Sequence, residues 1–179
     1  MKVNSRNPRL DQTRCSSRGA QEDCLVAAGK SDISGLDWYL EQGGLVDEKL
    51  YTTSWPMGVF PLTIACISYQ PKSVRWLLER GANPNKVKIK DEWLLISVIA
   101  MNQLDIFSEL IDKCSLDIKS KHGCSVLEIA EMSAHCPDGE RIYDDLKAIS
   151  RKRKRNTGHQ EDVFVLTKKS SCASPEHRG

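Results

Sequence analysis

The stretch FPLTIACISYQPKSVRWLLERGANPN, residues 60–85, decides the fold because it encodes two short helices and the turns that bound them. Residues 60–65 open a first helix, and Pro71 suits the first position of a second, where an N–H would have no partner. Residues 74–78 give that second helix an apolar face. Gly81 then ends the helix, because glycine adopts a left-handed C-cap conformation at low cost. The stretch therefore predicts a helix–turn–helix unit whose apolar face needs a neighbour to cover it.

The same pattern recurs downstream. Val98 follows Ala65 by thirty-three residues and Ala130 follows Val98 by thirty-two, each at the same point of an apolar helix. Helix pairs repeated at this period pack against one another and bury a continuous core. We therefore predict an all-α array rather than a single compact bundle.

An earlier copy precedes the clearest one. Its Ala27 lies thirty-eight residues before Ala65, which predicts that the loop between these copies is about five residues longer, around residues 52–57. Trp38 and Trp76 occupy apolar positions of their helices, and we expect both to be core residues.

These residues resemble the ankyrin repeat, whose pattern runs Thr-Pro-Leu-His-x-Ala, then a second helix, then Gly-Ala and a β-turn. The third copy departs from it with Trp93-Leu94 in place of Thr-Pro and Cys114-Ser115 in place of Gly-Ala. The resemblance implies an all-α ankyrin-repeat solenoid of helix–turn–helix units with β-turn finger loops. We expect about four repeats within residues 22–150, at 22–57, 58–90, 91–122 and 123–150. In the fourth, residues 135–139 read as an insertion between two helices.

The two ends of the chain differ in composition from the repeats. Residues 1–21 are basic, and residues 151–179 are basic and then polar, so neither can bury a core. We expect both to be disordered.

Composition and motifs argue against several function classes. No apolar run approaches the roughly 20 residues that a membrane-spanning helix needs. The seven cysteines lack paired spacing and no secretory signal is present, so we expect reduced thiols inside a cell, in the cytoplasm and nucleus. No catalytic or nucleotide-binding motif is complete, which predicts a protein that is not an enzyme and needs no cofactor. His122, Cys124, His135 and Cys136 are residue types that zinc accepts, but their spacing does not suit a structural site, and no metal is expected.

The resemblance implies that finger loops and first helices bind a protein partner, as in an adapter or inhibitor. Trp55 and Met57 on the lengthened loop are candidate apolar anchors. Two later loops are rich in lysine and would form a basic strip suited to an acidic partner segment. The lysines are Lys86, Lys88, Lys90, Lys119 and Lys121.

A compact basic cluster, Arg151, Lys152, Arg153, Lys154 and Arg155, follows the repeats. It predicts a nuclear-import signal read by an import receptor, and a solvated tail is the plainer alternative. Direct nucleic-acid binding is disfavoured, because about five cations would give weak, salt-dependent affinity. The alternative function is nonetheless a nucleic-acid-associated nuclear regulatory factor that uses this tail, which a salt titration of DNA binding would distinguish.

Overall fold

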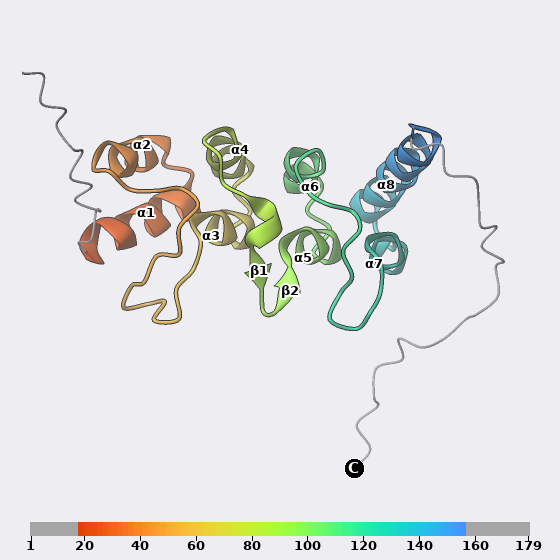
Figure 1. The fold of residues 1–179 in the computed structure, drawn as a ribbon, viewed down its shortest axis with the longest axis horizontal. Helices are drawn as coiled ribbons and strands as arrows, with labels where there is room; N and C mark the ends of the chain where they lie inside the picture. The colour runs from red at the N-terminus through yellow and green to blue at the C-terminus, as the bar shows by residue number, and fades with distance from the viewer. Residues whose placement is uncertain (1–17, 157–179) are drawn as a thin grey trace, which may run out of the picture.

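The computed structural model describes residues 18–156, which form eight α-helices arranged as four pairs (Figure 1). A short 3-10 helix and a two-stranded antiparallel sheet join the second pair to the third. The elements are α1 (Arg18–Lys30), α2 (Ile33–Glu41), α3 (Pro61–Ile67), α4 (Pro71–Glu79), η1 (Pro84–Lys86), β1 (Lys88–Ile89), β2 (Glu92–Trp93), α5 (Leu94–Ala100), α6 (Leu104–Leu110), α7 (Val126–Ser133) and α8 (Pro137–Asn156).

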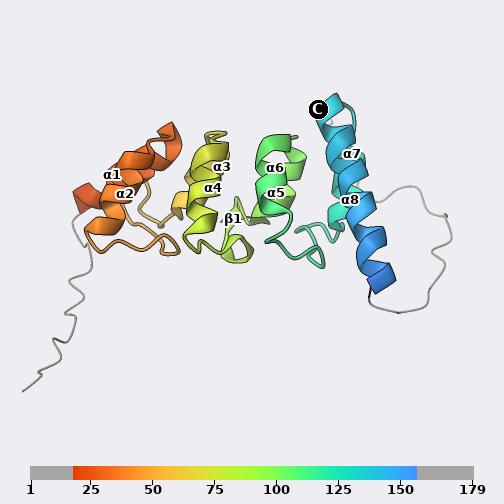
Figure 2. The ribbon, with the colours of Figure 1, turned by 90° about the horizontal axis from the view of Figure 1, so that it is seen from above.

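The pairs stack side by side into two layers. The first helices, α1, α3, α5 and α7, lie in one layer, and the second helices, α2, α4, α6 and α8, lie in the other (Figure 1). The loops between pairs emerge on one side of the array, and the turns within pairs lie on the opposite side (Figure 2). We call these loops the first finger (residues 44–59), the second finger (residues 83–93) and the third finger (residues 112–125).

The turn within each of the first three pairs is built in the same way. Ser31, Tyr69 and Asn102 have φ of 61°, 53° and 53°, so each occupies the left-handed region just after the first helix. The next residue then donates its backbone N–H to the carbonyl of Ala27, Ala65 or Val98, over 3.0, 2.8 and 3.2 Å. This is the bond that closes a helix C-terminus in a Schellman motif. It confirms that these three residues are equivalent, as their spacing predicted.

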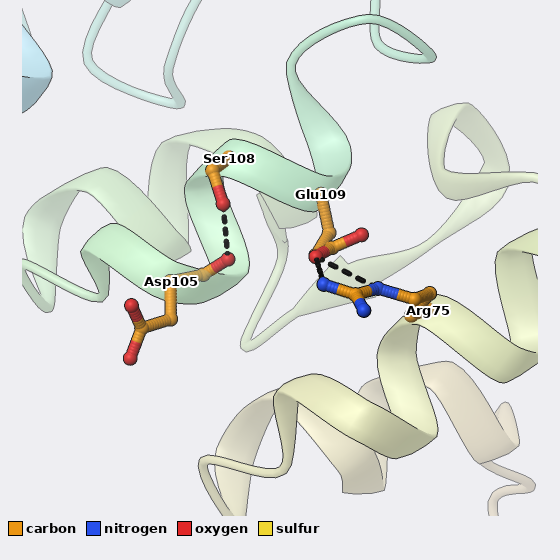
Figure 3. Close-up of polar contacts among 4 residues, drawn as sticks. All are labelled: Arg75, Asp105, Ser108 and Glu109. Carbon is orange, nitrogen blue, oxygen red and sulfur yellow. Dashed lines mark hydrogen bonds and ion pairs between the residues drawn. The ribbon is translucent and has the colours of Figure 1, made fainter.

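Successive pairs are also joined through equivalent positions of their second helices. The indole N–H of Trp76 on α4 donates to Asp37 on α2 over 3.2 Å, and the Arg80 guanidinium lies 3.0 Å from the same carboxylate. Thirty-three residues after Trp76, Glu109 on α6 pairs with Arg75 on α4, where Arg75 Nε lies 3.0 Å from Glu109 Oε1 (Figure 3). Helices α4 and α6 therefore use the same position to contact the preceding repeat.

The core runs continuously through the stack. Leu77 of α4 is fully buried, and every residue from Leu94 to Ile99 in α5 is buried, because α5 packs between α3 and α7 as well as under α6. Gly81 follows α4 with φ of 94°, as predicted for its end.

Both predicted ends of the repeat region differ from the structure. Helix α1 begins at Arg18, within the segment predicted to be disordered. Helix α8 begins at Pro137, so residues 137–139 belong to the helix, because proline suits a first helical turn. The same helix continues to Asn156, because residues 151–156 are mostly lysines and arginines, which favour helix and complement the negative end of its dipole. The remaining predicted disorder lies outside the described residues.

The prediction that Trp38 is a core residue is wrong. Trp76 is 6 % exposed, whereas Trp38, at the equivalent position of α2, is 43 % exposed. The difference follows from position in the array: Trp76 packs against the repeat before it, and no described residue precedes α1.

Candidate protein-binding surface

The first finger carries an exposed apolar tip that hydrogen bonds hold in place. Leu50 and Val59 pair across its base, and the Thr52 hydroxyl accepts the backbone N–H of Trp55 over 3.2 Å. Trp55 is 43 % exposed and Met57 is 86 % exposed, as candidate anchors must be. The predicted lengthening of this loop therefore appears as an ordered hairpin-like tip.

Helix α1 anchors this finger. The backbone N–H of Tyr51 donates to Gln21 Oε1 over 3.1 Å, and the Ser54 hydroxyl donates to Glu22 Oε1 over 2.8 Å. Gly58, with φ of 75°, closes the turn beneath the Tyr51 ring, where a Cβ would lie 2.6 Å from a ring carbon. Tyr51 is itself exposed, so the tip comprises Tyr51, Trp55 and Met57. Sequence reasoning missed Tyr51, although its place beside the lengthened loop was a usable signal.

The second finger is a tight β-hairpin that presents lysines. Lys88 pairs with Trp93 across its strands, and Lys90 and Asp91 form the turn with φ of 49° and 67°. Two positive φ values in succession are typical of a type I′ hairpin turn, whose twist matches that of the strands. Lys90 is therefore displayed at the tip, next to an exposed carboxylate.

The third finger lies beside the second and is joined to it. Its turn is closed by the Ser120 hydroxyl, which accepts the backbone N–H groups of His122 and Cys124 over 3.2 and 3.1 Å. The backbone N–H of Lys121 donates to Glu92 Oε2 on the second finger over 3.2 Å. The structure thus brings the two lysine-bearing loops together.

The five predicted lysines are all exposed, but they are not equivalent. Lys86 forms an ion pair with Asp47 over 2.6 Å, and the Lys88 ammonium lies 4.3 Å from the centre of the Trp93 ring. Lys119 lies at the bridge that closes the third finger, where its charge helps to lower the pKa of Glu128. Lys90 and Lys121 lie at the turns, and Asp91 and Asp117 interrupt the basic strip. A partner would therefore meet a row of mixed charge in which the tip lysines are the most available cations.

A second apolar edge lies at the other ends of the first helices. Ile67, Tyr69, Met101 and Met132 are all exposed at or just beyond the last turns of α3, α5 and α7. The first helices run from the finger side to this edge (Figure 2). Sequence reasoning missed these residues; the available signal was large apolar residues two to four positions after the buried Ala65, Val98 and Ala130.

The described cysteines do not form a reactive or metal-binding centre. Between Arg18 and Asn156, no three Cys, His, Asp or Glu side chains gather as metal ligands would. Burial raises the pKa of the Cys114 thiol to about 12, and burial together with the nearby Cys114 raises that of Cys66 further. Both thiols are therefore protonated at neutral pH. Within the same part of the chain, no helix is long and apolar enough to cross a bilayer.

The basic cluster starts on the last turns of α8. Arg151, Lys152 and Arg153 have exposed side chains there, and the helical backbone continues through Lys154 and Arg155. This end of α8 extends beyond the ends of the other second helices, on the side from which the fingers emerge (Figure 2). The first three side chains of the cluster are thus exposed on a helix, whereas a disordered segment was predicted.

Comparison with known proteins supports this architecture. The family model of the ankyrin repeat matches residues 57–89. A solved ankyrin-repeat domain from Acinetobacter baumannii superposes with a TM-score of 0.56 at 21 % sequence identity. The match covers 66 % of this chain and 59 % of that one. A search of curated proteins gave no match.

The chain carries an ankyrin-repeat domain. The family match falls on the second repeat, where the sequence pattern is clearest, and the solved structure shows that the neighbouring pairs share the fold of such a domain. Ankyrin repeats are protein–protein interaction modules, so the two exposed edges of this ankyrin-repeat domain are its candidate contact surfaces.

Proposed function

We propose that the protein is a non-enzymatic adapter or inhibitor that binds a partner protein along the finger side of its ankyrin-repeat domain. One observation carries the proposal: the exposed Trp55 and Met57 sit on a finger that α1 holds in a fixed conformation. A pre-ordered apolar tip loses little conformational entropy on binding, so more of its contact energy contributes to affinity.

The lysines of the second and third fingers suit an acidic segment of that partner. Charges at the edge of an interface mainly raise the association rate and depend on salt. An apolar anchor instead slows dissociation. The two parts of the surface therefore make separable contributions to binding kinetics.

The test has two steps. Affinity purification with mass spectrometry identifies the partner, and surface-based kinetics then compare variants at two salt concentrations. We expect Trp55→Ala to raise the dissociation rate at least tenfold, which is about 1.4 kcal/mol. The double variant Lys90→Glu and Lys121→Glu should slow association and reduce its salt dependence. These tip lysines are preferable to Lys88, whose reversal would also remove its contact with Trp93.

Lys72→Glu is the matched control, because Lys72 is exposed on α4 in the other helix layer. It changes the net charge but not the finger side, so it should leave both rates nearly unchanged. If Lys72→Glu slows association by the same factor per reversed lysine as the finger double variant, which reverses two lysines instead of one, only net charge matters. If Trp55→Ala leaves the dissociation rate unchanged, the partner does not use the finger tip.

We also propose that residues 151–155 act as a nuclear-import signal, so that the protein occupies both cytoplasm and nucleus. The exposed side chains of Arg151, Lys152 and Arg153 at a helix end support this. Import receptors bind basic signals as extended chains, so the last turns of α8 would have to unwind, which is easiest at a helix terminus.

Import can be tested with a large fluorescent fusion that cannot diffuse through nuclear pores. Alanine at Arg151, Lys152, Arg153 and Lys154 should shift the fusion to the cytoplasm. Arg141→Ala with Lys147→Ala removes cations from the same helix outside the cluster and should have no effect. Unchanged nuclear accumulation of the cluster variant would leave it as a solvated helix end.

A further inference from the structure

The first repeat ends the array with a partly apolar face. In later repeats, the position equivalent to Trp38 contacts the preceding repeat: Trp76 is buried and bonded to Asp37, and Glu109 is bonded to Arg75. Trp38 has no described repeat before it and is 43 % exposed. Its ring therefore lies on a surface whose equivalents are in contact with the preceding repeat at the next two junctions.

Helix α1 contributes to the same face. Ile64 of α3 packs against α1, because a Cβ built on Gly29 would lie 3.2 Å from Ile64 Cγ2. Val26 precedes Ala27 as Ile64 precedes Ala65, so it occupies the same position on α1 that Ile64 occupies on α3. Val26 is 47 % exposed. Val26 and Trp38 line a cavity of about 390 Å³ together with the charged residues Asp23, Lys30 and Asp32. The end face is thus a hollow with apolar walls and a mostly acidic rim.

The opposite end of the array is different. Helix α8 buries Ile142 and Leu146 against the stack and exposes charged residues, Glu140, Arg141, Asp144 and Asp145. A polar outer face is what a terminal repeat needs for solubility. The outer face of the N-terminal repeat is apolar at Val26 and Trp38, so the two ends of the array are not equally capped.

We propose that residues 1–17 of this chain cover the end face, with Leu10 as the apolar anchor against Val26 and Trp38. The segment is joined directly to α1 at Arg18 and can reach the cavity. Val26 lies eight residues into α1, roughly 12 Å along its axis. The eight residues from Leu10 to Arg18 span up to about 26 Å when extended.

Charge favours this occupant. Residues 1–17 contain Lys2, Arg6, Arg9 and Arg14 against a single Asp11. The cavity rim presents Asp23 and Asp32 against Lys30. Basic side chains flanking Leu10 would therefore face a rim of net negative charge.

Area favours a tethered segment over a second copy of the chain. The exposed parts of Trp38 and Val26 together amount to only on the order of 100–200 Å². A stable dimer buries about 800 Å² on each partner. A segment attached to α1 needs far less contact area, because a short tether gives it a millimolar effective concentration.

The test uses the full chain labelled with ¹⁵N and follows the indole N–H signals of its four tryptophans. Loss of one signal in Trp38→Phe assigns Trp38. We expect Leu10→Ala to shift the Trp38 signal and leave the Trp55 and Trp93 signals in place. Met132→Ala removes an exposed apolar side chain at the other end of the array and serves as the matched control.

An unchanged Trp38 signal in Leu10→Ala would overturn the proposal. A Trp38 signal that moves with protein concentration but not with Leu10→Ala would also overturn it, and would indicate a second copy on this face. The Met132→Ala control should leave Trp38 unchanged; an equal shift in both variants would mean that the effect is not local, which contradicts docking of Leu10.

Discussion

Tyr69 shows how the fold holds a single residue in a conformation that its own side chain disfavours. Its φ of 53° lies in the left-handed region, which costs a residue with a Cβ roughly 1–2 kcal/mol. The turn after α3 requires this geometry so that the next N–H can reach the Ala65 carbonyl. The tyrosine hydroxyl donates to Asp105 over 3.4 Å, a weak surface contact that does not offset the cost. The exposed ring is thus displayed on a strained turn.

This geometry predicts that Tyr69→Gly is more stable than Tyr69→Ala by about 0.5–1 kcal/mol. Both variants lose the same ring, but only glycine adopts positive φ without strain, and its larger unfolded-state entropy cancels part of the gain. Urea unfolding of the two variants measures the difference. At Ala148, an exposed interior position of α8, glycine should instead destabilise the helix. If alanine is the better residue at position 69, the left-handed assignment is wrong.

Leu77 predicts the largest effect at a single position. It is fully buried on the apolar face of α4, so Leu77→Ala removes contacts and leaves a cavity. The expected loss in the free energy of unfolding is about 2–5 kcal/mol. Thermal or urea unfolding checks this against Glu79→Ala, an exposed change two residues away that should stay within about 0.5 kcal/mol. Equal midpoints for the two variants would contradict the predicted register.

At the scale of the element, α7 begins with a capping box. The Ser125 hydroxyl accepts the backbone N–H of Glu128 over 3.3 Å, while the Glu128 carboxylate accepts the backbone N–H and hydroxyl of Ser125 over 2.7 and 2.9 Å. Both hydrogen bonds that Ser125 donates favour the ionised carboxylate and so lower the pKa of Glu128. The bond from the backbone N–H has the larger effect. The start of α7 is therefore sensitive to pH.

Ser125→Ala should cost about 1 kcal/mol at pH 7. Because the folded-state pKa of Glu128 is lowered, its contribution is complete above the ordinary glutamate pKa and is lost as pH falls through the lowered value. The gap between wild type and Ser125→Ala should therefore narrow in acid. Urea unfolding at pH 7 and below pH 4 measures it, with Ser34→Ala on α2 as the control. A gap that widens in acid would contradict this assignment.

Element positions could be predicted from sequence because they depend on local chemistry. Pro71 and Gly81 bound α4 as expected, and the Ala27, Ala65 and Val98 register is confirmed by the turn bonds. The start of α8 was missed because proline and glycine at residues 137–139 read as a loop, although proline suits a first helical turn. At the candidate site, Trp55 and Met57 are exposed as predicted, because an apolar residue in a lengthened loop has no core to enter. Exposure on the helices was less predictable: Trp38 and Trp76 share a pattern, and position in the array alone separates them.

At the scale of the whole molecule, repeats are coupled through their neighbours, and stability is close to a sum of repeat and interface terms. Trp76 lies at the junction of the first and second repeats, where its ring also packs under Arg80 at 3.9 Å. The exposed Trp38 has no equivalent junction among the described residues. The same residue type at the same repeat position thus has two different environments.

Trp76→Ala should therefore cost about 3–5 kcal/mol and separate unfolding of the first repeat from the rest. Trp38→Ala should cost much less and leave unfolding cooperative. Hydrogen exchange resolved by residue measures this, because α1 and α2 should lose protection earlier than α4 in Trp76→Ala alone. Uniform loss of protection in Trp76→Ala would mean that this junction does not limit cooperativity.

The hydrogen bonds of the first finger to Gln21 and Glu22 on α1 mean that the two ends of the array should respond differently to force. A pulling force applied at the N-terminal side would detach α1 first and release the Trp55 tip with it. The second and third fingers are tied to each other through Glu92 and Lys121, so they would keep their shape under the same load. A partner bound chiefly by the apolar tip of the first finger would therefore dissociate under tension. A partner bound by the lysines of the second and third fingers would remain bound.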